Sequence, residues 1–330
     1  MIDRNPSPPV FILGAGRSGT TWLASIFDSH PDTFFIHEPD IIRPTQTLPF
    51  VPAADAIDTH VAAAGAYAEQ LIRVRGLRAM QKRPFFPKTY RGRLAHHGRR
   101  GLILGLAGLE KATGRWLALG HAPVPALGRV ERATPILKSV SSLNRLAAFA
   151  KAKPDWHFIH MLRHPGAIAV SLRRGAALGK MEPARFYEAQ LAMPLSRAQG
   201  LTSARVAAMS DIEKTAWSWA VTNDFVMATT EGMGNVHLVR YEDLCADPIA
   251  VSQDLFARTG LAWKAQTAAF LRQSLETAAD ASAYHSVVRN PAIAAGKWKD
   301  QLSASEKQLI GAIIAPSRAG RLYPPDETFS

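Results

Sequence analysis

The chain has 330 residues, with 39 Lys and Arg against 27 Asp and Glu, so its formal net charge is +12. Hydrophobic residues make up 47% of the chain, enough for a sizeable buried core, and the positive charge suits an anionic partner such as a nucleotide, an acidic glycan or a membrane surface. Cys245 is the only cysteine, which excludes an intrachain disulfide and argues against a Cys/His zinc site.

The N-terminus does not have the pattern of a signal peptide, because Asp3 and three prolines precede only a short apolar run. An uncharged apolar stretch of about 18 residues, the length needed to cross a bilayer, is not found. The nearest candidate, residues 101–120, is interrupted by Glu110, Lys111 and Arg115. We therefore expect a cytoplasmic protein.

Short apolar runs alternate with helical patterns along the chain, which predicts an α/β fold. The expected strands and helices, in chain order, are Val10–Gly14, the helix Thr20–Ser29, Thr33–Ile36, Pro135–Val140, the helix Asn144–Lys153, His157–Leu162, the helix Gly166–Leu178, and Val236–Val239. We expect a three-layer structure, a parallel sheet with helices on both faces and a helical C-terminal third. The prediction is a single domain, residues 1–330, with a basic helical insertion at about 45–134.

The residues from Gly14 to Thr21 connect the first strand to the first helix and are typical of a phosphate-binding loop. Glycines allow the backbone to approach an anion, and the loop N–H groups and helix N-terminus then surround it. Hydroxyl donors come from Ser18, Thr20 and Thr21. Thr20 replaces the lysine that reaches the β- and γ-phosphates in nucleotide triphosphatases, and Arg17 supplies a cation inside the loop instead.

The six residues Arg17–Trp22, RSGTTW, resemble the loop of the sulfotransferase family that holds the 5'-phosphate end of the donor. The resemblance implies the fold of that family, a phosphate-loop-like fold, with 3'-phosphoadenylyl sulfate (PAPS) as donor, a hydroxylated acceptor and no metal. The donor-binding residues that it implies in this loop are Arg17, Ser18, Gly19, Thr20, Thr21 and Trp22. For Trp22 two interpretations stay open, stacking on adenine or packing in the core.

His37 and Glu38 follow the second strand, at the same sheet edge as the loop. Sulfuryl transfer needs a base for the acceptor proton and cations for the charge on the leaving oxygen. Successive strand residues point to opposite faces, so we do not expect both side chains to reach the sulfur. Family members that act on glycans and on protein tyrosine have a glutamate here, which favours Glu38 as the base, with His37 second and a structural pair third.

The segment from Arg73 to Arg100 has ten Lys or Arg residues and no acid. One interpretation is a solvated basic helical face. The other is a lid or groove for an anionic acceptor, or a peripheral contact with a membrane surface. We expect no nucleic-acid partner.

Two further strand ends extend the resemblance. Lys138, at the third strand, is implied to approach the bridging oxygen of the donor, with Arg17 as a second candidate; the alternative is a lysine in solvent.

Arg163 ends the fourth strand, where it faces the ligand crevice of an open α/β sheet, and a guanidinium binds phosphate through two hydrogen bonds. Family members hold the 3'-phosphate with an arginine here and a serine eight residues later, which is Ser171. His164 stands where the family often has Asp.

The C-terminal part adds weaker candidates. Tyr241, in the sequence YEDL, is implied to touch the adenine. Arg289 and the sequence GKWK at 296–299 resemble a degraded form of the last donor-binding segment of the family, which makes Arg289 a candidate for the 3'-phosphate and Ser286 a further catalytic candidate.

The function that these residues indicate is in-line transfer of a sulfuryl group from PAPS to a glycan, lipid, tyrosine or small metabolite, with a carboxylate base. A kinase or nucleotide triphosphatase is the first alternative, against which the missing lysine argues. A basic protein that binds polyanions through residues 73–100 is the second, and it leaves the loop and the Arg163–Ser171 pair unexplained.

Overall fold

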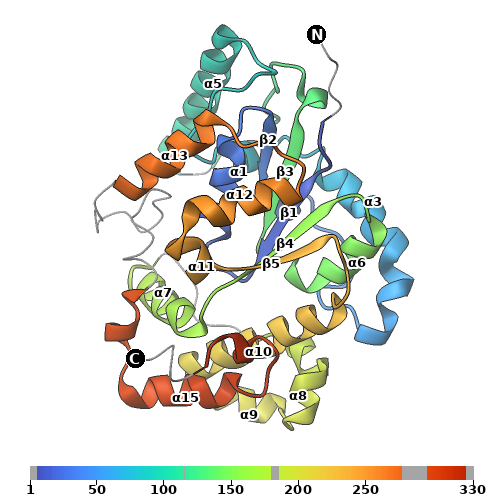
Figure 1. Cartoon of the computed structure of the whole chain (residues 1–330), viewed down its shortest axis with the longest axis vertical. Coiled ribbons are helices and arrows are strands. Elements are labelled where there is room, and N and C mark those ends of the chain that lie inside the picture. The colour runs from blue at the N-terminus through green and yellow to red at the C-terminus, as the bar shows by residue number, and fades with distance from the viewer. Residues whose placement is uncertain (1–5, 115, 180–185, 277–295, 325–330) are drawn as a thin grey trace.

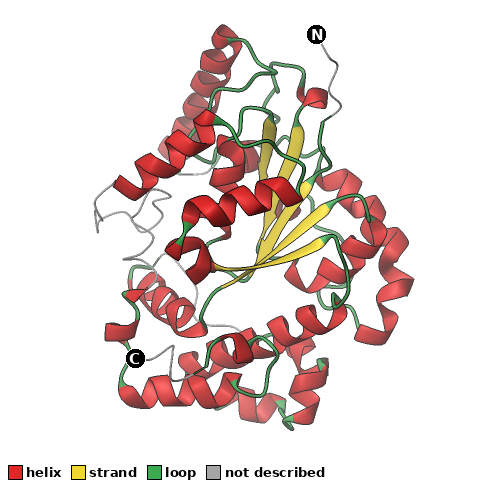
Figure 2. Cartoon of the chain, in the orientation of Figure 1, coloured by secondary structure: helices red, strands yellow, loops and turns green. Residues whose placement is uncertain are grey.

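The computed structural model describes residues 6–114, 116–179, 186–276 and 296–324. A parallel five-stranded sheet has the order β2-β3-β1-β4-β5 and is flanked by helices (Figures 1 and 2). The strands are β1 (Val10–Gly14), β2 (Thr33–His37), β3 (Thr134–Ser139), β4 (His157–Leu162) and β5 (Val236–Arg240). Every predicted strand is confirmed, and each end lies within one residue of its predicted position.

Helices on both faces of the sheet and the helical C-terminal third are confirmed as well. The helices are α1 (Thr20–Ser29), α2 (Pro39–Ile42), α3 (Val61–Leu71), α4 (Leu77–Met80), α5 (Arg93–Ala112), α6 (Leu146–Ala152), α7 (Pro165–Ala177), α8 (Pro194–Ala198), α9 (Ser203–Ala207), α10 (Asp211–Thr229), α11 (Tyr241–Ala246), α12 (Pro248–Arg258), α13 (Ala265–Glu276) and α15 (Ala304–Ile314). Capping boxes begin α10 and α15, as the Ser-x-x-Glu patterns in the sequence indicate.

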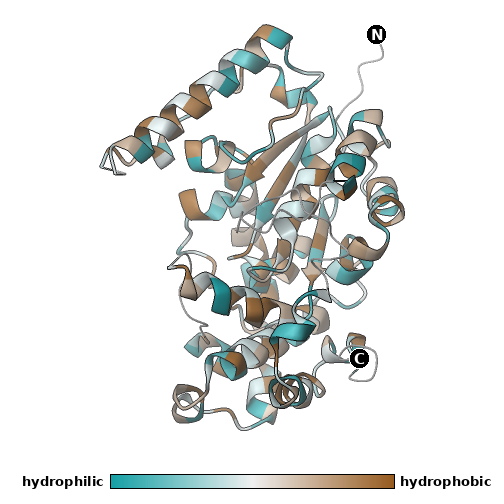
Figure 3. Cartoon of the chain, turned by 90° about the vertical axis from the view of Figure 1, so that its left-hand side faces the viewer, coloured by the Kyte–Doolittle hydropathy of each residue, from teal (hydrophilic) through white to brown (hydrophobic). Residues whose placement is uncertain are grey.

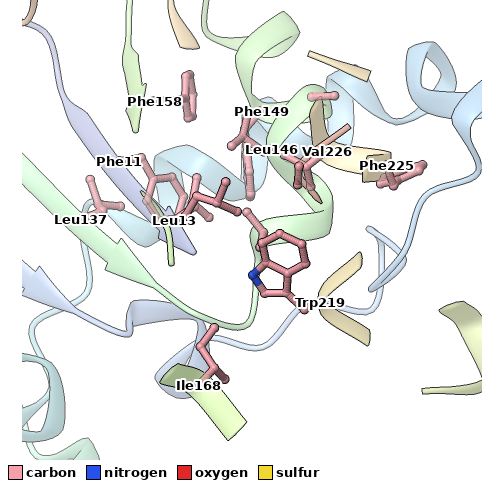
Figure 4. Close-up of a cluster of buried hydrophobic side chains, with 14 of the residues drawn as sticks. Phe11, Leu13, Leu137, Leu146, Phe149, Phe158, Ile168, Trp219, Phe225 and Val226 are labelled. Carbon is pink, nitrogen blue, oxygen red and sulfur yellow. The ribbon is translucent and has the colours of Figure 1, made fainter. Parts of the chain in front are cut away.

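Each face of the sheet has its own hydrophobic core, because neighbouring residues of a buried strand point to opposite sides. Phe11 and Phe158 pack with Phe149 of α6 on the face covered by α3, α6 and α10 (Figure 4). Ile12 belongs to the core on the other face, where Phe27 of α1 stacks on Phe256 of α12. The sheet is therefore the middle of three layers.

The central strand β1 lies between β3 and β4, so the chain moves to one side of β1 first and to the other side later. Such a reversal of strand order opens a crevice at the carboxyl ends of the strands, where ligands of open α/β sheets bind. Leu13 pairs with Ser139, and Gly14 pairs with Met161. The register therefore brings the phosphate-loop sequence, the end of β3 and the residues after β4 to one edge.

The basic segment covers the outer edge of β2, which would otherwise present unpaired backbone groups. Tyr90 Oη donates to the carbonyl oxygen of Thr33 at 3.2 Å, and the guanidinium of Arg75 lies 4.5 Å from the centre of the Phe34 ring. Helix α5 then projects from the top of the molecule, with hydrophobic and hydrophilic residues along its length (Figures 1 and 3). Within the described part of the chain, no helix combines the length and the apolar character that a membrane span needs.

Candidate functional site

The loop between β1 and α1 has two residues in the left-handed backbone region, Arg17 with φ 70° and Gly19 with φ 94°. A Cβ atom at Gly19 would lie 2.3 Å from Cδ2 of Tyr241, so only glycine fits this position. Arg17 has a side chain, and holding it at this φ costs about 1–3 kcal/mol. Strain of this kind is typical of loops shaped for a ligand.

Two polar atoms of the loop region are buried without a hydrogen-bond partner among the described residues. They are Oγ of Ser18 and Nε1 of Trp22. Leaving a buried hydroxyl or N–H group unpaired costs about 1–3 kcal/mol, which a bound anion removes for a donor that it can reach. Trp22 also packs against the edge of Tyr241, with ring centres 6.1 Å apart, and belongs to the second hydrophobic core. Its place therefore favours the core interpretation of Trp22 over an open stacking surface.

The two expected phosphate-binding ends meet directly. Arg163 Nη1 donates a hydrogen bond to the carbonyl oxygen of Arg17 at 3.0 Å, and Arg17 Nε donates to Ser171 Oγ at 2.7 Å. The guanidinium of Arg163 lies 4.2 Å from the centre of the Tyr241 ring. Each guanidinium has five N–H donors, so these contacts are compatible with phosphate binding. The structure thus brings Arg17, Arg163, Ser171 and Tyr241 into one cluster.

His164 caps the N-terminus of α7. Its Nδ1 accepts a hydrogen bond from the N–H of Gly166 at the start of α7, and its ring stacks on Trp298 with centres 4.3 Å apart. Burial, together with the charges of Lys299 and Arg163, lowers the pKa of His164 to about 3. A neutral imidazole is the form that can accept the capping hydrogen bond.

Two more contacts hold the backbone at the end of β4. Glu242 Oε1 accepts from the N–H of His164 at 3.0 Å, and Trp219 Nε1 donates to the carbonyl oxygen of Arg163 at 2.8 Å. Glu242 is fixed in turn by Oη of Tyr323, at 2.8 Å. These contacts orient the strand end that carries Arg163.

The low pKa of His164 predicts a defined loss of stability in acid. Between the unfolded pKa near 6.5 and the folded pKa near 3, the unfolded chain binds one more proton at this residue, so stability falls as the pH is lowered. His164→Asn keeps a capping acceptor and removes the titration. We expect the slope of unfolding free energy against pH, measured by urea denaturation between pH 6 and 4, to decrease by about 1.4 kcal/mol per pH unit. An unchanged slope would show that the ring is already protonated in the native state.

Glu38 and Lys138 form a buried ion pair between Oε1 and Nζ at the carboxyl ends of β2 and β3. The exposed fraction is 7% for Glu38 and 3% for Lys138, so Lys138 is not a lysine in solvent. The N–H of Val140 donates to Glu38 Oε2 at 3.0 Å, and the N–H of Glu38 donates to the carbonyl oxygen of Lys138 at 2.7 Å. Glu38 has φ 45°, again the left-handed region. The carboxylate is therefore held by contacts on both oxygens.

His37, the second candidate base, is the last residue of β2. Burial lowers its pKa well below the usual value, and the charges of Lys138 and Lys82 lower it further, so the imidazole is neutral near pH 7. Its Nδ1 atom is buried and has no hydrogen-bond partner among the residues that the structure describes. His37 and Glu38 thus both lie near Lys138, and Glu38 makes the direct contact.

Sequence reasoning missed Lys82 and Asp40. Lys82 comes from the basic segment, and its pKa is lowered first by burial and then by Lys138, while Glu38 raises it, which places it within electrostatic reach of the pair. The sequence offered no signal for it beyond the run of cations without an acid. Asp40 Oδ2 accepts hydrogen bonds from Ser139 and Ser142, and its place after His37-Glu38-Pro39 could have suggested a role in fixing the end of β3.

Of the remaining predicted site residues, two lie in the structure and two lie outside the described residues. Thr20 is buried at the start of α1, and Thr21 follows it half-buried. Arg289 and Ser286 lie outside the described residues.

These features define the class of protein, an α/β protein in which the loop after β1 and two basic strand ends meet at one edge of the sheet. The sequence model of the sulfotransferase family matches residues 8–265. Since this match covers most of the chain, the chain belongs to the sulfotransferase family, and it is an enzyme of that family. No curated protein sequence matches it significantly.

Solved structures that are similar to the chain include other sulfotransferases. The sulfotransferase domain of the olefin synthase of Synechococcus PCC 7002 is 17% identical, with a TM-score of 0.44 and coverage of 94% of this chain and 95% of that one. The sulfotransferase domain of the curacin biosynthetic pathway is 18% identical, with a TM-score of 0.44 and coverage of 94% and 98%. A mouse sulfotransferase in complex with PAP is 14% identical, with a TM-score of 0.49 and coverage of 99% and 90%. These likenesses are distant, and the family assignment depends on the sequence match.

Proposed function

We propose that this sulfotransferase takes its sulfuryl group from PAPS and transfers it to a hydroxyl group of a glycan, a lipid, tyrosine or a small metabolite. The observation that carries the proposal is the hydrogen bond between Arg163 Nη1 and the carbonyl oxygen of Arg17, which joins the two phosphate-binding ends of the donor site. A nucleotide with phosphates on both ends of one ribose would contact both basic groups at once.

In the proposed donor complex, the loop N–H groups and the N-terminus of α1 bind the 5'-phosphate end. Ser18, buried and without a partner among the described residues, adds a hydroxyl donor. Arg163 and Ser171 bind the 3'-phosphate, and Tyr241, next to Gly19 and beneath Arg163, contacts the adenine. Arg289 stays a candidate for the same phosphate. No residue in this arrangement requires a metal ion.

The proposed reaction is an in-line displacement at sulfur. The acceptor oxygen forms a bond to sulfur while the bond from sulfur to the bridging phosphate oxygen breaks. Glu38 takes the proton of the acceptor hydroxyl, and the positive charges of Lys138 and Arg17 stabilise the leaving oxygen. The products are a sulfate ester and adenosine 3',5'-bisphosphate. Lys138 is held by Glu38 before the reaction, so the two groups are in place together.

Transfer of labelled sulfate from PAPS to a mixed panel of hydroxylated acceptors tests the proposed function. We expect a labelled product that depends on the protein and on PAPS and that forms without a divalent metal. Magnesium-dependent hydrolysis of ATP without any sulfate transfer would contradict the proposal and favour the kinase alternative.

We also propose that residues 1–330 form one domain in which residues 45–134 are an insertion beside β2. Leu71, Leu77 and Ile103 of this segment belong to the same hydrophobic cluster as Phe11 and Phe34 of the sheet, which supports a shared core.

A further inference from the structure

A small cavity lies between β2 and the basic segment, and none of its lining residues belongs to the phosphate-binding loop. Its volume is about 40 Å³, which is enough for a few water molecules or one small oxyanion. Its lining includes Phe34 and Phe35 of β2. The charged residues that line it are Lys82, Lys88, Arg91, Arg99, Arg100 and a single acid, Asp28. The cavity is therefore strongly positive.

The single acid is already used by one of these cations. Lys88 Nζ lies 2.8 Å from Asp28 Oδ1 and also donates to the carbonyl oxygen of His30 at 3.0 Å and to Thr33 Oγ1 at 3.3 Å. Lys88 therefore has a full set of partners. Asp28 acts on Arg99 through its charge alone, and its described ion pair is with Lys88.

Arg91 and Arg99 are held in place by neutral groups only. Arg91 is 9% exposed and its Nε donates to the carbonyl oxygen of Ala126 at 2.9 Å, while Nη2 is buried without a hydrogen-bond partner in the part of the chain that the structure describes. Arg99 is 8% exposed, and its Nε donates to the carbonyl oxygen of Pro125 at 3.2 Å. Both guanidiniums are thus oriented by neighbouring carbonyls of one loop.

Bringing two guanidinium groups out of water beside each other is costly unless a counter-charge is present. The pKa of Arg99 is lowered to about 10, mainly by burial and then by the charge of Arg91, which agrees with this cost. The unpaired Nη2 of Arg91 adds the cost of an unmade charged hydrogen bond. An oxyanion in the cavity would remove both costs, since guanidinium and oxyanion geometries match.

We propose that this cavity is a second anion site, separate from the donor site, and that it binds a small oxyanion group such as a sulfate, phosphate or carboxylate. Lys82 lines the cavity and also interacts electrostatically with Lys138 and Glu38, which connects the cavity to the reacting end of the donor site. The oxyanion has two possible sources, a free ion or an anionic group of the acceptor. Binding of an anionic group of the acceptor rests on the proposed function, whereas binding of a free ion does not.

Thermal unfolding of the full-length protein with increasing sodium sulfate, at an ionic strength held constant with sodium chloride, tests the site. The variants are Arg91→Met and, as a matched control, Arg93→Met, which removes an exposed arginine two residues away. Saturating adenosine 3',5'-bisphosphate in a parallel series occupies the donor loop. We expect a saturable rise of the unfolding midpoint in the wild type and in Arg93→Met, with and without the nucleotide, and its loss in Arg91→Met.

An equal, saturable sulfate response in Arg91→Met and Arg93→Met, or none in the wild type, would overturn the proposal. If Arg91→Met does not fold, Arg91→Lys keeps the charge but not the forked geometry, and we expect it to need at least about tenfold more sulfate for half of the response. A missing response to the nucleotide alone would count against the proposed donor site and not against the cavity.

The source of the oxyanion is determined by measuring KM for two hydroxyl acceptors, one of which carries an additional carboxylate. If the acceptor supplies the anion, Arg91→Met raises KM for the acidic acceptor about tenfold or more and leaves the neutral one unchanged. Unchanged KM values for both, together with a lost sulfate response, assign the site to a free ion. Unchanged KM values with an intact sulfate response would overturn the site altogether.

Discussion

Replacing Glu38 by glutamine is expected to lower the turnover number by about 10²–10⁴-fold, the usual contribution of a positioned general base. Glutamine keeps the size of the side chain and a carbonyl oxygen for the N–H of Val140, and it removes the group that takes the acceptor proton. Binding of adenosine 3',5'-bisphosphate should change little, because the proposed contacts to its two phosphates lie on the loop and at Arg163 and Ser171. Sulfate transfer under saturating donor measures the first effect, and calorimetric titration with adenosine 3',5'-bisphosphate measures the second.

The matched control is Glu69→Gln, which removes a carboxylate that pairs with Lys153 away from the donor loop. We expect this variant to turn over like the wild type. If Glu38→Gln did the same, Glu38 would not be the base. His37→Gln would then be the variant to measure, since His37 is neutral and lies near Lys138.

Changing Gly19 to alanine is expected to disrupt both ends of the donor site. The new Cβ would lie 2.3 Å from Cδ2 of Tyr241, and the backbone at φ 94° is unfavourable for any side chain. Strain and overpacking each cost about 1–3 kcal/mol. Displacement of Tyr241 also disturbs Arg163, whose guanidinium lies over that ring. We expect a lower unfolding midpoint without ligand and a loss of stabilisation by adenosine 3',5'-bisphosphate.

Gly16→Ala is the control for this prediction, because a Cβ at Gly16 would have no atom within 4 Å. Without ligand it should unfold like the wild type. Wild-type stability in Gly19→Ala would mean that Tyr241 does not pack against the loop.

The fold was largely predictable, since the buried strands are short apolar runs and the helices between them have clear periodicity. Val10–Gly14, for example, is buried at every residue, as its apolar sequence predicts. The donor loop and Arg163 were predictable because their residues follow strands directly in the chain, and the carboxyl ends of parallel strands meet at one edge.

Other features depend on contacts that the chain order does not reveal. Lys82 reaches the Glu38–Lys138 pair only because the basic segment folds over the edge of β2. The left-handed conformations of Arg17 and Glu38 have no signal in residue type, since neither residue favours them. The stacking of His164 on Trp298 joins two residues more than a hundred positions apart in the chain, so no local sequence pattern indicates it.

The central claim is that Arg17 and Arg163 hold opposite ends of one nucleotide. Calorimetric titration of the wild type and Arg163→Met with adenosine 3',5'-bisphosphate and with adenosine 5'-monophosphate, which lacks only the 3'-phosphate, tests this directly. Losing a buried charged contact costs about 2–5 kcal/mol, so the wild type should bind the bisphosphate at least about 30-fold more tightly, and the variant should lose most of this preference. The same preference for the bisphosphate in both proteins would contradict the account.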